Sequence, residues 1–213
     1  MKRALVLTVV VAAAGICAPL GATPEHLARI AQLVAQYGDQ VITTADATRQ
    51  LTNFDPDSGL VRDAGGRLNI AESSLNYAAA LLEAGVNPER AGQVIEAVLA
   101  QQDRTEDSPT RGLFRWMAGA GSAYDANATL YLAPALAHLT RELKSSGRAG
   151  EALRQSASLA LTGLLAYPKR PQDGFVAAMW AGAVCALGEA TGTAIGQEAG
   201  RQLVSRWLAQ EVQ

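Results

Sequence analysis

The sequence predicts an all-α protein, an incomplete α/α toroid made of one N-terminal helix and about three helical hairpins. Its 213 residues are 49% hydrophobic but only 5% aromatic, and few of them are β-branched, which disfavours an all-β fold. Glycine and proline residues mark the ends of the predicted helices. The first helix of each hairpin, here called the leading helix, begins near residue 71, 126 or 175, and this spacing of about fifty residues indicates a structural repeat. Helices without charges alternate with helices that carry charges on one face.

The first 22 residues are predicted to be a secretory signal peptide. Met1-Lys2-Arg3 is positively charged, residues 4–16 are apolar, and small residues lead to a cleavage site after Ala22. The apolar run is shorter than the roughly 20 residues that span a bilayer. The alternatives are an N-terminal core helix and a lipoprotein, although the bulky residue before Cys17 disfavours lipidation. Residues 23–213 are therefore expected to form one periplasmic or secreted domain without a membrane span.

The N-terminal helix is predicted to begin at Thr23-Pro24-Glu25, which supplies a cap, a proline at the first helical position and an acidic first turn. Apolar residues then recur at helical spacing. An irregular stretch over 53–66 is expected to separate this helix from the first hairpin.

Three hairpins are predicted to follow. The helix pairs are 71–84 with 88–102, 126–145 with 148–165, and 175–190 with 194–210. The first turn, Gly85-Val86-Asn87-Pro88, combines a C-terminal glycine, an Asn cap and a proline at the first helical position. Pro134 falls within the fourth helix and predicts a bend, or a helix that starts near Ala133.

The leading helix of each hairpin carries almost no charge, whereas its partner is charged on one face. A helix that is apolar all round is buried on both sides, so the leading helices are expected to form an inner layer and the trailing helices an outer, solvated one. The turns within hairpins are short, while the connections over 103–124 and 166–174 are long. Functional sites tend to lie on long loops, which are expected to gather at one rim.

Composition excludes several functions. The net charge of −2 argues against nucleic acid, because binding phosphates requires a clustered basic surface. Two histidines and two cysteines predict no metal centre and no disulfide framework, and nothing indicates a cofactor. Cys185 is interpreted as a small buried hydrophobe left unpaired after signal cleavage. His138 is interpreted as a core histidine whose ring nitrogens have hydrogen-bond partners, with a proton-transfer role as the alternative.

Several stretches resemble the six-hairpin glycosidases, the α/α toroids that include glycoside hydrolases and heparinase-like polysaccharide lyases. The resembling residues are 57–63, 101–103, 108–116 and 125–127. The resemblance covers about residues 50–190 and only the N-terminal half of such a toroid. It implies a carbohydrate-related activity and an open edge that a partner chain or a second copy would close.

No carboxylate pair stands out as catalytic. The candidates are Asp57 and Asp125, among the acidic residues of the loop-rich side: Asp55, Asp57, Asp63, Glu72, Glu106, Asp107, Asp125 and Asp173. Glycoside hydrolysis needs two carboxylates roughly 5–9 Å apart. Helix capping is the favoured interpretation of Asp125 and Asp173, and turn formation is favoured over a calcium loop for the aspartates of 55–63.

The predicted ligand-binding residues lie in and just after the longest connection: Arg115, Trp116, Tyr124 and Asp125. Aromatic faces stack on sugar rings, and arginine pairs with carboxylate or sulfate groups. Two large apolar groups in a loop normally become buried, which favours the alternative that Phe114 and Trp116 plug the helical core. Tyr77, Tyr131 and Trp180 are interpreted as core residues that could also line a cavity.

The predicted function is carbohydrate hydrolysis, lyase chemistry or binding outside the cytoplasm, and whether a reaction occurs stays open. The alternative is a non-catalytic helical scaffold that self-associates, or pairs with a partner, through its open edge.

Overall fold

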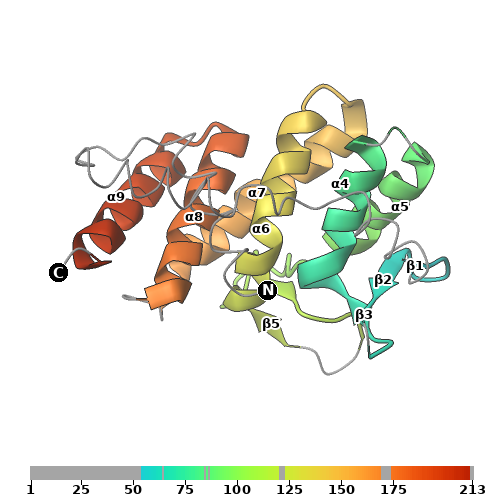
Figure 1. Ribbon diagram of the computed structural model, residues 1–213, viewed down its shortest axis with the longest axis horizontal. Coiled ribbons are helices and arrows are strands. Elements are labelled where there is room, and N and C mark those ends of the chain that lie inside the picture. The colour runs from blue at the N-terminus through green and yellow to red at the C-terminus, as the bar shows by residue number, and fades with distance from the viewer. Residues whose placement is uncertain are drawn as a thin grey trace. The chain divides into compact units, whose positions relative to one another are not determined.

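The computed structural model describes residues 54–63, 65–83, 85, 87–119, 123–168 and 174–211. The predicted signal peptide and the predicted helix after Thr23 lie outside the described residues. What is described is mostly helical, with a few short strands (Figure 1). The elements are β1 Phe54–Asp55, β2 Leu60–Arg62, β3 Leu68–Asn69, the π-helix η2 Ile70–Ser74, α4 Leu75–Glu83, α5 Pro88–Leu99, β4 Phe114–Arg115, β5 Tyr124–Asp125, α6 Ala126–Glu142, α7 Gly147–Ala166, α8 Gly174–Thr191 and α9 Ala194–Glu211.

The three predicted hairpins are confirmed, because α4 packs on α5, α6 on α7 and α8 on α9. Asn87 caps α5 with a left-handed φ of 48°, and its side-chain oxygen accepts the Arg90 amide at 3.1 Å. Pro134 lies within α6, which begins at Ala126 rather than near Ala133. The described elements fall into two units, one comprising 54–167 and the other α8 with α9.

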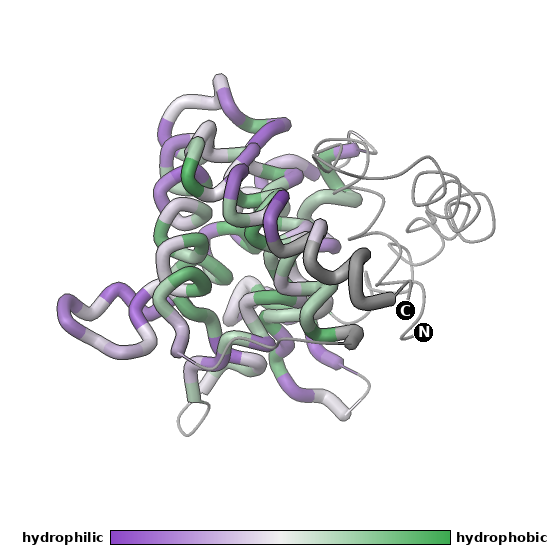
Figure 2. The backbone as a smooth tube through the Cα atoms, turned by 90° about the vertical axis from the view of Figure 1, so that its left-hand side faces the viewer, coloured by the Kyte–Doolittle hydropathy of each residue, from purple (hydrophilic) through white to green (hydrophobic). Residues whose placement is uncertain are grey.

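The leading and trailing helices of the first unit differ in burial as predicted. Eleven of the 17 residues of α6 are buried, against five of the 12 in α5. The apolar stretches lie along the helices, while polar residues concentrate in turns and on exposed helix faces (Figure 2). Within this unit α4 contacts α6 and α5 contacts α7, so two hairpins stack with like helices side by side.

The described residues of the stretch predicted to be irregular include strands, which corrects the expectation from sequence. Strands β1, β2 and β3 form an antiparallel sheet in that order, with Phe54 opposite Val61 and Val61 opposite Asn69. The hydroxyl of Ser74 accepts the Val61 amide at 3.0 Å and donates to the Asn69 carbonyl. This buried serine therefore ties the sheet to η2, where the chain enters α4.

The first and second hairpins are also joined by a buried polar clasp. The Gln102 side-chain amide donates to the carbonyls of Gly112 and Ser156, each at 3.0 Å. In return the Ser156 hydroxyl donates to the Gln102 side-chain oxygen at 2.7 Å. Both residues are at most 4% exposed, so the chain just beyond α5 is fixed to the middle of α7.

In the second unit, α8 is buried from Ala177 to Gly188, as its charge-free sequence predicts. Cys185 is 1% exposed, but it is disulfide-bonded, so the expectation of an unpaired thiol is wrong. Helix α9 lies very close to it, since a Cβ added to Gly200 would fall 2.6 Å from the Cys185 Cα. Within the described ranges, no helix is long and apolar enough to cross a membrane.

Candidate functional site

The segments that precede α4 and α6 lie side by side. The Ile70 amide donates to the Trp116 carbonyl and the Ala118 amide donates to the Leu68 carbonyl, both at 3.0 Å. Asn69 and Met117 form an antiparallel bridge between these bonds. Since η2 continues directly from β3 and α6 directly from β5, the loop-rich ends of the two leading helices meet, as predicted for this unit.

The four predicted ligand-binding residues all lie in or next to the two-stranded ribbon β4–β5. Phe114 pairs with Asp125, and Arg115 pairs with Tyr124. Directly paired residues share a face, and successive residues alternate between faces. Arg115 and Tyr124 therefore occupy one face of the ribbon, while Asp125 and Trp116 occupy the other, so the structure brings the four together and divides them into two pairs.

Trp116 and Asp125 are joined by a hydrogen bond between their side chains. The indole Nε1 of Trp116 donates to Asp125 Oδ2 at 2.7 Å, while Asp125 Oδ1 accepts the Asn127 amide at 2.9 Å and caps α6. The Trp116 ring also packs on Tyr131, with centroids 5.2 Å apart and an interplanar angle of 54°. Asp125 thus has the predicted capping role and also holds the indole, and the three side chains are all half-buried.

Arg115 and Tyr124 form a cation–π pair, with the guanidinium carbon 4.3 Å from the ring centroid. Arg115 Nη1 donates to the Gly119 carbonyl at 3.4 Å, and Nε is buried without a hydrogen-bond partner in the described part of the chain. Several other arginines of those residues pair with carboxylates, including Arg62 with Asp55. Among the described residues, the Arg115 charge faces an aromatic ring rather than an anion.

Phe114 has the plug role that the sequence offered as an alternative. Its side chain is fully buried, and its amide donates to the Thr129 hydroxyl at 2.8 Å. That hydroxyl donates in turn to the Asp125 carbonyl at 3.1 Å. The buried phenylalanine and this hydrogen-bond chain fix the ribbon to the first turn of α6, while Trp116 is half-buried.

Asp103 was not among the sequence candidates, although it lies in a stretch that carries the resemblance. It is 2% exposed, and its carboxylate accepts hydrogen bonds from the Thr105 amide, the Ser108 hydroxyl and the Thr110 hydroxyl at 3.0, 2.5 and 2.7 Å. Burial raises the pKa of Asp103, but these hydrogen bonds outweigh it and lower the pKa from 3.8 to about 2. Asp103 thus fixes the connection that leads to the ribbon.

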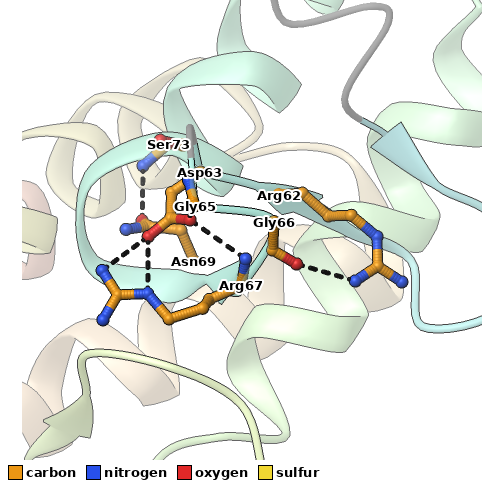
Figure 3. A network of polar contacts seen from close by, with 7 residues as sticks. All are labelled: Arg62, Asp63, Gly65, Gly66, Arg67, Asn69 and Ser73. Carbon is orange, nitrogen blue, oxygen red and sulfur yellow. Dashed lines mark hydrogen bonds and ion pairs between the residues drawn. The ribbon is translucent and has the colours of Figure 1, made fainter.

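The aspartates of 55–63 include two with the turn role that the sequence favoured over calcium binding, Asp55 and Asp63. Figure 3 shows the Asp63 carboxylate facing Arg67, which donates to it from its main-chain amide at 3.0 Å and from its guanidinium at 2.9 and 3.0 Å. The Arg67 amide is the main reason that the pKa of Asp63 is lowered. In Asp55 the pKa is lowered chiefly by the Ser58 hydroxyl and then by Arg62. Asp57 is exposed in the turn between β1 and β2.

The remaining candidates are mostly core residues. Tyr77 and Trp180 are at most 2% exposed, as the core interpretation predicts. His138 is satisfied but is not a core histidine, because its side chain is 33% exposed and Nε2 lies 3.1 Å from Glu83 Oε1. In the ranges that the structure describes, no group of three or more His, Cys, Asp or Glu could hold a metal ion.

No family model matches the chain, and no curated protein or solved structure is similar to it.

Proposed function

We propose that this chain is a carbohydrate-binding protein of α/α-toroid architecture that acts outside the cytoplasm, and that its ligand lies across the ribbon β4–β5. The observation that carries the proposal is the contact between two half-buried aromatic residues at the start of α6, Trp116 and Tyr131, with Arg115 and Tyr124 paired on the other face of the ribbon. A rigid, half-exposed aromatic ring offers contact area at a low cost in conformational entropy and suits the apolar face of a sugar.

The chemistry of Arg115 favours a saccharide that carries carboxylate or sulfate groups. Its guanidinium carbon lies 4.3 Å from the centroid of the Tyr124 ring, and the group is not paired with a carboxylate of the described residues. A stacked guanidinium keeps its N–H edges available for the two-point hydrogen bonding that such anions accept.

We propose binding rather than hydrolysis as the activity of this site. Asp125 uses one carboxylate oxygen for the α6 cap and the other for Trp116, and Asp57 lies in the exposed turn of another sheet. Neither residue has the arrangement expected of a carboxylate pair flanking a glycosidic bond. The toroid itself is supported by two hairpins stacked with like helices in contact and by the resemblance to six-hairpin glycosidases.

Replacing Trp116 by alanine is expected to weaken saccharide binding by at least about tenfold, the loss typical of a central aromatic contact. Titration calorimetry with an oligogalacturonate, a sulfated dextran oligomer and a neutral cello-oligosaccharide would measure it. Trp116→Phe, which keeps an aromatic ring, should lose less affinity than Trp116→Ala. Unchanged affinity in Trp116→Ala, with the wild-type melting temperature, would remove the ribbon as the site.

Replacing Arg115 by glutamine should weaken binding of the acidic oligomers and leave the neutral one unaffected. Arg104→Gln is the matched control, because Arg104 is exposed in the same connection and surface charges contribute little. Equal losses for acidic and neutral ligands would refute the assignment of an acidic saccharide.

A second candidate function, the self-associating scaffold, is favoured by two exposed apolar residues of the second unit. Val176 is 39% exposed and Ile195 is 73% exposed, and association with another chain would remove these apolar side chains from water. If this surface associates, Ile195→Lys should weaken the dimer at least about tenfold, because it would bury a charge. Sedimentation equilibrium tests this, and a wild-type chain that stays monomeric contradicts it.

A further inference from the structure

The bond between Trp116 and Asp125 assigns to Asp125 a role that differs from direct ligand contact. Its carboxylate oxygens lie 2.9 Å from the Asn127 amide and 2.7 Å from the Trp116 indole nitrogen. Each oxygen of this carboxylate already accepts a hydrogen bond from the protein, which leaves one lone pair on each oxygen for any other donor. Trp116, in contrast, is only half-buried.

Trp116 is held at three points. Its carbonyl accepts the Ile70 amide at 3.0 Å, its indole nitrogen donates to Asp125, and its ring packs on Tyr131. The first contact fixes the main chain, the second fixes the direction in which the ring edge points, and the third supports one side of the ring. Of the three, only the bond to Asp125 selects the orientation of the indole edge.

We propose that Asp125 is a positioning residue that orients Trp116 for a saccharide ring. The proposal rests on the function proposed above. Immobilising a side chain in its bound conformation before the ligand arrives removes an ordering cost from binding. The carboxylate that caps α6 thereby also sets the orientation of the Trp116 indole. The start of the helix and the shape of the site therefore both depend on Asp125.

The two tasks of Asp125 can be separated by substitution. Asparagine and serine cap helices about as well as aspartate, so Asp125→Asn and Asp125→Ser should retain α6. Asparagine has a single side-chain oxygen, and when this accepts the Asn127 amide its NH2 group faces the indole N–H, placing two donors against each other. Serine has a single oxygen and keeps the cap without that conflict.

The test follows the ring directly. The chain has three tryptophans, so an indole ¹⁵N-labelled sample gives three N–H signals, and Trp116→Phe identifies that of Trp116. In Asp125→Asn and Asp125→Ser this signal is expected to move upfield and to exchange faster with solvent, while the other two stay in place. Asn87→Gly, which removes the cap of α5, should leave the Trp116 signal unchanged.

Binding is then measured with the same oligogalacturonate. Both Asp125 variants are expected to bind about 3- to 10-fold more weakly than wild type, as the loss of one pre-organised side chain implies, with a melting temperature close to wild type. An unchanged indole signal, or a displaced signal with wild-type affinity, overturns the positioning role. If wild type binds none of the saccharides, the proposed function fails, and the ligand role of Asp125 fails with it even where the indole signal moves.

Discussion

Replacing Gly112 by alanine is expected to lower the free energy of unfolding by about 3–5 kcal/mol, combining the cost of a left-handed backbone with that of overpacking. Gly112 has a φ of +91°, and a Cβ at this position would lie 2.1 Å from the Leu159 carbonyl oxygen in α7. Backbone atoms of a packed helix cannot move aside cheaply. Gly163 of α7 lies at the same close approach between the connection and the helix. A Cβ added to Gly163 would fall 2.5 Å from the Arg111 carbonyl oxygen.

Gly92→Ala is the matched control for Gly112→Ala. A Cβ at Gly92 meets nothing within 4 Å, and the residue lies inside α5, where alanine is favoured over glycine by about 0.8–1 kcal/mol. Chemical denaturation should therefore show the two substitutions acting in opposite directions. A loss below about 1 kcal/mol for Gly112→Ala, less than its backbone conformation alone would cost, would show that the connection can move away from α7.

The second large effect is an acid-dependent loss of stability caused by Asp103. Its pKa in the folded chain is about 2, against 3.8 for a free aspartate, so the unfolded chain binds the proton more readily. The stabilisation is therefore fully present above about pH 5 and is lost as the pH falls towards about 2, and the difference amounts to about 2 kcal/mol. The cause is the three hydrogen bonds that favour the ionised carboxylate.

Asp103→Ala should cost about 2–4 kcal/mol at neutral pH, because it removes three hydrogen bonds to an ionised carboxylate. It should also flatten the dependence of stability on pH between 5 and 2, measured by urea denaturation. Asp107→Asn is the control, since Asp107 is exposed with a φ of 62°, a conformation that asparagine tolerates. An Asp103→Ala variant with the same acid sensitivity as wild type would assign that sensitivity to other carboxylates.

The hairpins could be predicted from the sequence because their signals are local. The Asn87-Pro88 start of α5, the Asp125 cap and the nearly charge-free leading helices are all signals that act within one or a few turns of helix. The small sheets could not be predicted, because strands of two or three residues carry no periodicity. Their stability comes from distant partners, such as the pairing of Asn69 with Met117.

The sequence could group the four candidate residues, but it could not predict how they are arranged. Arg115, Trp116, Tyr124 and Asp125 were identified by residue type and by their place in and just after a long connection. Their division between two ribbon faces depends on the register that pairs Arg115 with Tyr124, which nothing in the local sequence specifies. Asp103 was missed because its partners, Ser108 and Thr110, have the composition of an ordinary polar loop.

The Gln102 clasp has a consequence for cooperativity. In solenoid repeats each unit contacts only its neighbours and can unfold from one end, but here a buried side chain from beyond α5 bonds to main chain and side chain in the middle of α7. Opening either hairpin alone would leave the buried polar groups of Gln102 and Ser156 without hydrogen-bond partners. The amides of α5 and α7 are therefore expected to exchange with deuterium at a common opening free energy, as a single foldon.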